Sequence, residues 1–134
     1  MATYLLDTNI IIDSLNARYG RPELLDGLIS QGILLACSSI NVTEVYMGMR
    51  PHEAAMTEKL LRSLEFYPVT WEVARYAGEL YNHWRKQGQT LSLPDATIAA
   101  VCLTHKLTLV TDNQKHFPMP ELKLLPLPDP EQSG

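Results

Sequence analysis

Hydrophobic residues along this chain follow two kinds of pattern. Short continuous apolar runs predict buried strands, and apolar residues at three- and four-residue spacing predict helices. The clearest runs are TYLLD, ILLACS and LTLVT, with shorter candidates at EFYPV and LKLL. We therefore predict strands over residues 3–7, 33–38, 65–69, 107–111 and 122–125.

The segments between these strands predict helices. The clearest is 71–88, where Trp71 and Trp84 belong to an apolar stripe at helical spacing. Gly32 and Pro94 have the residue types typical of a helix end and a helix start. The predicted helices cover residues 8–16, 22–32, 39–49, 51–65, 71–88 and 94–106. Strands that alternate with helices predict an α/β fold with a parallel sheet in layers.

Length and composition narrow the class of protein. The 134 residues, 46% of them hydrophobic and 19% charged, predict one globular domain over 1–126 with a flexible tail over 127–134. No signal peptide is recognisable, and no apolar run approaches the roughly 18 residues of a membrane span. Cys37 and Cys102 lie far apart in apolar surroundings, which predicts buried free thiols in a reducing cytoplasm.

Charge alone does not decide the function. The formal net charge of −4 gives no overall basic footprint for nucleic acid. It leaves a nucleic-acid enzyme possible, because bound divalent cations and a local Arg/Lys cluster can supply the attraction.

Four acidic residues stand at predicted strand ends or helix starts. Asp7 closes the first strand, Glu44 follows the second, Asp95 begins the helix over 94–106, and Asp112 follows LTLVT. Because these positions share one edge of a parallel sheet, we expect the four acids to surround one crevice. Carboxylates so close repel one another, and oxygen ligands favour a hard divalent cation such as Mg²⁺ or Mn²⁺.

Each acid also has a plainer interpretation. Asp95 and Glu44 are the fourth residues of spacings that match or resemble a capping box, so either could cap its helix. Asp7 could cap a helix, although its apolar surroundings make that costly, and Asp112 could be a turn residue. Four caps that converge on one edge are the less economical explanation, so we favour a metal site.

Other polar and aromatic residues are assigned structural roles. We expect Asp13 to be the solvated end of the first helix and Arg50 to be a surface charge. His83 and His116 are expected on the surface without partners. The two tryptophans are expected to face the core rather than to stack on bases.

Three blocks of the sequence resemble a known family. LLDTNIIID, SSINVTEVYMGMR and LPDATIAAVCLTHKLTLVTDNQKHF are similar to the PIN domain, in particular to VapC-type toxins of toxin–antitoxin pairs. The resemblance implies a three-layer α/β/α sandwich around a mainly parallel sheet of four to five strands. It also implies an Mg²⁺- or Mn²⁺-dependent endoribonuclease that forms homodimers and is held inactive by a cognate antitoxin.

The resemblance also implies the site residues. The family's first three acids fall on Asp7, Glu44 and Asp95, with Asp7 and Asp95 as the primary metal ligands and Glu44 assisting. The fourth position falls on Asn113, with Asp112 one residue earlier, and which of the two faces the metal stays open. Supporting hydrogen bonds are expected from Thr8, Asn9 and Thr111.

The partner surfaces and the activity leave alternatives. Tyr46, Met47, Met49 and Met56 could form a dimer or antitoxin surface, or belong to an ordinary core. A non-catalytic module of the same fold could bind RNA or protein without cutting. A phosphoacceptor domain fits less well, because Asp7 has no adjacent acid and LTLVT is not followed by Lys.

Overall fold

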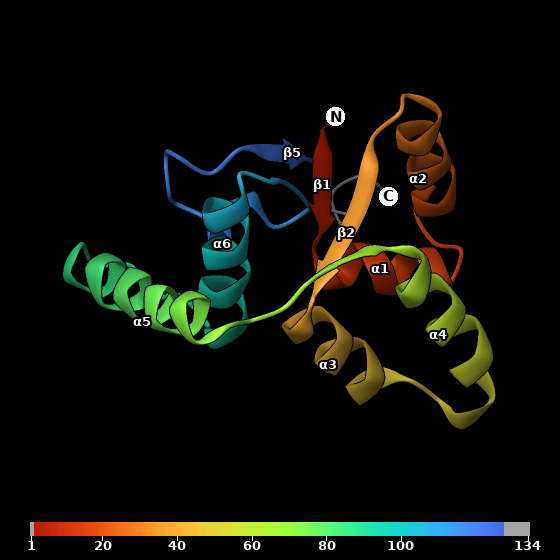
Figure 1. Ribbon diagram of the computed structural model, residues 1–134, viewed down its shortest axis with the longest axis horizontal. Coiled ribbons are helices and arrows are strands. Elements are labelled where there is room, and N and C mark those ends of the chain that lie inside the picture. Colours follow the sequence, from red (N-terminus) through yellow and green to blue (C-terminus); the bar gives the residue numbers. More distant parts are fainter. Residues whose placement is uncertain (1, 128–134) are drawn as a thin grey trace.

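The computed structural model describes residues 2–127, which build a five-stranded sheet with helices on both faces (Figure 1). The strand order is β3-β2-β1-β4-β5, and all four neighbouring pairs are parallel. The strands are β1 (Thr3–Leu6), β2 (Leu34–Ser38), β3 (Glu65–Tyr67), β4 (Thr108–Thr111) and β5 (Leu124–Pro126). The predicted three-layer α/β/α sandwich with a parallel sheet is therefore confirmed.

Helices connect the strands. Most helices begin and end within a few residues of the predicted bounds, but the single helix predicted over 51–65 is divided into a short 3₁₀ turn and an α-helix. The α-helices are α1 (Thr8–Leu15), α2 (Arg21–Ser30), α3 (Ser39–Gly48), α4 (Ala54–Ser63), α5 (Trp71–Lys86) and α6 (Leu93–His105), and the 3₁₀ turns are η1 (Pro51–Glu53) and η2 (Gln114–His116). No helix within residues 2–127 has the length and apolar character needed to cross a membrane.

Alternating side chains of the central strands divide the core into two clusters. Leu5 and Leu109 pack with α5 and α6, whereas Leu6 and Val110 pack with α1, α2 and α4. These four side chains have no exposed surface. Both faces of β1 and β4 are thus covered, which explains why these strands are continuous apolar runs in the sequence. Figure 1 shows the two helical layers on either side of β1 and β2.

Two expectations about buried residues have different outcomes. Cys37 and Cys102 are buried and free, as predicted, and burial raises the pKa of the Cys37 thiol to about 11. The prediction that Trp71 faces the core is wrong, because Trp71 is 72% exposed at the first position of α5. Trp84 packs against the core as expected. The predicted tail over 127–134 lies, apart from Leu127, outside the described residues.

Candidate active site

Asp7 joins the end of β1 to the start of α1. Its backbone N–H donates to the Val110 carbonyl on β4, 2.9 Å away, and the residue is the N-cap of α1. Its Oδ1 accepts from the Thr8 backbone N–H at 2.9 Å, and its Oδ2 accepts from the Thr111 hydroxyl at 2.8 Å. Only 6% of the residue is exposed. The carboxylate is therefore held by one donor at the start of α1 and one at the end of β4.

The surroundings of Asp7 make its ionised form costly. Burial raises the pKa of its carboxyl to about 6, although the hydrogen bonds from Thr111 and Thr8 oppose the rise. The charges of Asp95 and Asp112 raise the pKa further. Three carboxyl groups from three distant parts of the chain therefore lie within electrostatic reach of one another.

Glu44 is tied to the same place through Thr8. The Thr8 hydroxyl donates to Glu44 Oε1 at 2.6 Å and accepts from Asn41 Nδ2 at 3.0 Å. Asn41 is fully buried, and its Oδ1 accepts from the Ser38 backbone N–H at 2.8 Å where β2 becomes α3. Glu44 is thus bonded across to α1, and the capping interpretation of this acid is wrong.

Asp95 lies in the first turn of α6. Its backbone N–H donates to the Ser92 hydroxyl at 3.1 Å, which is the expected N-cap of that helix. Its Oδ2 is 3.3 Å from Nδ1 of the exposed His116. The prediction that His116 has no partner is therefore wrong.

Asp112 and Asn113 follow β4 and point to different partners. Asp112 Oδ2 is 3.5 Å from Nη2 of Arg21, and both side chains are almost fully buried. The Asn113 backbone N–H donates to the Thr111 hydroxyl at 2.9 Å, so the turn is fixed to the group that holds Asp7. Both residues therefore lie at the acidic edge, but Asp112 is paired with the guanidinium of Arg21.

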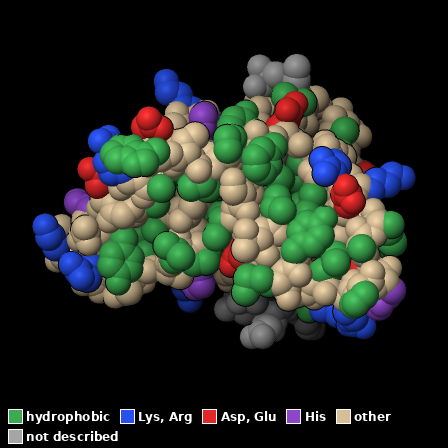
Figure 2. Space-filling model, turned by 60° about the horizontal axis from the view of Figure 1, so that its bottom comes forward, with side chains coloured by type: hydrophobic (Ala, Val, Ile, Leu, Met, Phe, Trp, Pro, Cys, Tyr) green, Lys and Arg blue, Asp and Glu red, His purple; other side chains and the backbone are tan. Residues whose placement is uncertain are grey.

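The donors of this crevice fit a hard divalent cation. The side chains of the four acids at this edge offer carboxylate oxygens, and oxygen ligands of this kind suit Mg²⁺ or Mn²⁺. Within residues 2–127, no group of three or more His, Cys, Asp or Glu side chains is arranged so that it could hold a metal ion. Each acid is instead engaged by Thr111, Thr8, His116 or Arg21. Figure 2, in which the carboxyl ends of the strands are turned toward the viewer, shows acidic atoms in a small hollow near the middle of the face. Hydrophobic and neutral side chains surround this hollow, and most Lys and Arg side chains lie toward the outline of the molecule.

Comparison with known proteins identifies the fold. The family model of the PIN domain matches residues 4–120. The chain belongs to the PIN domain family. Ribonuclease VapC19 of Mycobacterium tuberculosis is 32% identical over 120 residues, which cover 89% of this chain and 96% of that protein.

Two solved structures of similar fold come from toxin–antitoxin systems. VapBC2 from Rickettsia felis, bound to a DNA fragment from its promoter, has a TM-score of 0.81 at 26% identity and covers 93% of this chain and 98% of its own. A toxin–antitoxin complex from Klebsiella pneumoniae has a TM-score of 0.74 at 29% identity, over 89% of this chain and 94% of its own.

Within this PIN domain, the predicted supporting residues have different surroundings. Thr8 and Thr111 are buried and donate to Glu44 and Asp7, respectively. Asn9 is exposed, and its side chain makes no hydrogen bond to another residue of the described part of the chain. Its supporting role stays a prediction.

Three residues near the site were not recognised in the sequence. Arg21 precedes a proline at a helix start, where nothing in the local pattern predicts a buried guanidinium. Asn41 could have been found, since Ser38 and Asn41 have the spacing of a helix cap. Asp13 was expected in solvent, but it is half-buried, and burial together with the charge of Asp112 raises the pKa of its carboxyl.

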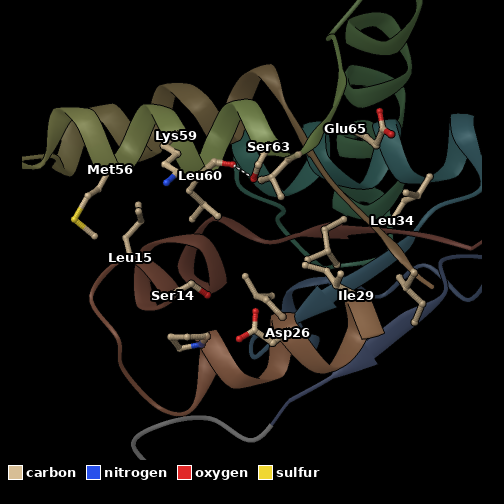
Figure 3. Close-up of a pocket in the computed structure, with 15 residues that line it drawn as sticks. Ser14, Leu15, Asp26, Ile29, Leu34, Met56, Lys59, Leu60, Ser63 and Glu65 are labelled. Carbon is tan, nitrogen blue, oxygen red and sulfur yellow. Dashed lines mark hydrogen bonds between the residues drawn. The ribbon is translucent and has the colours of Figure 1, made fainter. Parts of the chain in front are cut away.

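A large cavity of the PIN domain lies away from the acids. It has a volume of about 670 Å³ and lies between α1, α2 and α4, beside the amino ends of β2 and β3 (Figure 3). Its lining is mainly apolar, and it includes the exposed side chains of Ile29, Leu34 and Met56. Asp26, Lys59 and Glu65 add charge to the lining. Such a groove is suited to an apolar segment of a partner rather than to phosphodiester chemistry.

Proposed function

We propose that this PIN domain is a divalent-cation-dependent endoribonuclease and the toxin of a toxin–antitoxin pair. The observation that carries the proposal is the acidic edge of the sheet, in a chain similar to ribonucleases of the VapC group. Asp95 and Asp112 lie within electrostatic reach of Asp7 there, and Glu44 is bonded to the neighbouring Thr8.

The cation would be held by Asp7 and Asp95, with Glu44 assisting and Asn113 beside them. When bound, Mg²⁺ or Mn²⁺ supplies charge neutralisation for a phosphate and activation of a water for attack. The chain's own groups orient the ligands: Thr111 holds Oδ2 of Asp7, and Thr8 holds Oε1 of Glu44. These hydrogen bonds fix the carboxylates before substrate arrives, which reduces the cost of assembling the site.

A cleavage assay tests the proposal. Purified chain is incubated with a mixed RNA pool in Mg²⁺, in Mn²⁺ and in EDTA, beside Asp7→Asn, Asp95→Asn and the matched control Asp26→Asn. Asp26 is an exposed acid of α2. We expect cation-dependent cutting by wild type and by Asp26→Asn, with a loss of about 100-fold or more in the two site variants. Equal cutting by all four proteins would reject the assignment.

We propose further that the groove of Figure 3 receives an apolar segment of the cognate antitoxin. Two solved neighbours of similar fold are a VapBC structure and a toxin–antitoxin complex, which supports such a partner. Ile29 is 57% exposed in the lining, so Ile29→Glu is expected to reduce co-purification of the co-expressed antitoxin. Retention equal to that of wild type would contradict the assignment of this groove.

The same proposal includes a homodimer and a cytoplasmic location. Tyr46, Met47 and Phe66 are exposed on α3 and β3, and Tyr46 and Phe66 line one shallow pocket together. An apolar surface of this kind is suited to a second copy of the chain. The free buried Cys37 and Cys102 are compatible with a reducing cytoplasm.

A further inference from the structure

Arg21 and Asp112 form a buried ion pair beside the acidic crevice. Nη2 of Arg21 is 3.5 Å from Oδ2 of Asp112, and the two side chains are 8% and 5% exposed. A guanidinium this deeply buried costs a large desolvation free energy unless carboxylates compensate for it. The pair is therefore a defined feature of the fold rather than a contact between mobile surface groups.

The turn between α1 and α2 brings Arg21 to this position. Ala17, Tyr19 and Gly20 have φ values of 52°, 56° and 67°, so two residues other than glycine adopt the left-handed conformation. Such residues are unfavourable by about 1 kcal/mol each and persist where the surrounding structure requires them. The turn ends at Arg21, the first residue of α2, whose side chain is directed toward the residues that follow β4.

The charge of Arg21 acts on more than one acid. It lowers the pKa of the Asp13 carboxyl, whereas the charge of Asp112 raises it. Asp112 also raises the pKa of Asp7. Asp112 thus lies within electrostatic reach of Asp7 and is paired with Arg21.

We propose that Arg21 is a positioning residue that serves as the crevice's internal counter-ion and withholds Asp112 from the metal. The inference rests on the proposed cation site. Because the guanidinium holds Asp112, the cation is bound by Asp7, Asp95 and Glu44. Asp112 is then not a metal ligand, and Arg21 neutralises its charge. The positive charge of Arg21 also opposes a second cation on that side.

The test is a calorimetric titration of the metal-free protein with MnCl₂. Neutralising Arg21 in Arg21→Gln frees Asp112 and removes a repelling charge, so Mn²⁺ affinity is expected to rise about tenfold. Asp112→Asn removes a negative charge and leaves the positive charge of Arg21 in place, so it is expected to lower the affinity. The double variant Arg21→Gln/Asp112→Asn removes both charges of the pair and leaves the net charge beside the crevice unchanged, so it is expected to bind Mn²⁺ as wild type does.

Two control variants separate this role from mere structural support. Arg18→Gln makes the same charge change on an exposed residue of the same turn and is expected to leave the affinity unchanged. Arg21→Lys keeps the charge and is expected to stay within about twofold of wild type. A purely structural role for Arg21 predicts weaker binding on its removal, not tighter binding.

The outcomes distinguish the inference from the function on which it rests. Wild-type binding that Asp7→Asn abolishes, with unchanged or weaker binding in Arg21→Gln, would overturn only the role of Arg21. A double variant that binds much more weakly than wild type would show that Asp112 is a ligand and would also overturn it. Wild type without measurable Mn²⁺ binding would overturn the cation site itself and this inference with it.

Discussion

The carboxylate of Asp7 is buried, and its negative charge is therefore costly to the fold. Its pKa is raised from 3.8 to about 6, first by burial and then by neighbouring acids. Because the folded pKa lies above the ordinary value, the stability due to the protonated form is complete below about pH 4 and is lost as the pH rises through 6. In metal-free protein at neutral pH, Asp7 opposes folding.

Replacing Asp7 by a neutral residue is expected to stabilise the metal-free protein. We expect Asp7→Asn to raise the free energy of unfolding by about 1–2 kcal/mol at pH 7.5, which is less than the full pKa shift implies because Asn accepts fewer hydrogen bonds. The gain should disappear below about pH 4. Urea unfolding in chelator-treated buffer across this pH range measures it, with Asp26→Asn as the control. A loss of stability at pH 7.5 would contradict the argument.

Thr8 links Glu44 to the buried Asn41, and its hydroxyl is the only polar atom of its side chain. Thr8→Val removes a donor to Glu44 and an acceptor for Asn41. We expect a loss of about 1–2 kcal/mol in the free energy of unfolding and a fall of about tenfold in RNA cleavage. Thr43→Val is the matched control, because the exposed Thr43 hydroxyl donates only to the Ser39 carbonyl of its own helix. Equal effects of the two substitutions would show that the link does not position Glu44.

The acids and their partners differ in how well the sequence predicts them. Asp7 and Asp95 are recognisable because each interrupts or begins an apolar segment at a predictable place in a parallel sheet. Arg21 is not recognisable in this way, because its partner Asp112 lies far along the chain. The pair forms only because the chain reverses direction at the turn between α1 and α2. Long-range ion pairs leave no local pattern.

The turn between α1 and α2 stores backbone strain at Ala17. A left-handed alanine is unfavourable, so Ala17→Gly is expected to raise the free energy of unfolding by about 0.5–1 kcal/mol. Ala55→Gly, inside α4, makes the same change in an ordinary helical conformation and is expected to lower it by a similar amount. Thermal unfolding measures both changes. A more stable Ala17→Gly and a less stable Ala55→Gly would support backbone strain at Ala17, whereas a destabilised Ala17→Gly would contradict it.

The strands and helices were predicted from hydrophobic periodicity with small errors at their ends. Central strands covered on both faces have continuous apolar runs, and β1, β2 and β4 follow that rule. The error at Trp71 has a physical cause, because the first residue of a helix is not held to the buried stripe and α5 begins at the surface. Periodicity describes the middle of an element better than its ends.

At the scale of the whole molecule, the two apolar surfaces that we assign to partners need not serve the same partner. Phe66 is 55% exposed on β3, beside Tyr46 in the surface that we assign to a second copy. Phe66→Glu is expected to shift the protein from dimer to monomer in light scattering at micromolar concentration, because it places a charge in an apolar contact. Ile29→Glu, in the groove of Figure 3, is the control and should remain dimeric. Dimers that persist in Phe66→Glu would place the interface elsewhere.

The central claim is that water, directed by the acidic edge of the sheet, cuts the RNA backbone. The most direct measurement is cleavage of a defined RNA in ¹⁸O-labelled water with Mn²⁺, followed by mass spectrometry of the product ends. The proposal predicts one ¹⁸O atom on the phosphate for each bond cut, no cyclic phosphate, and no products from Asp7→Asn. Unlabelled 2′,3′-cyclic phosphate ends would mean that the ribose hydroxyl is the nucleophile, and they would contradict the assignment of these acids to a hydrolytic site.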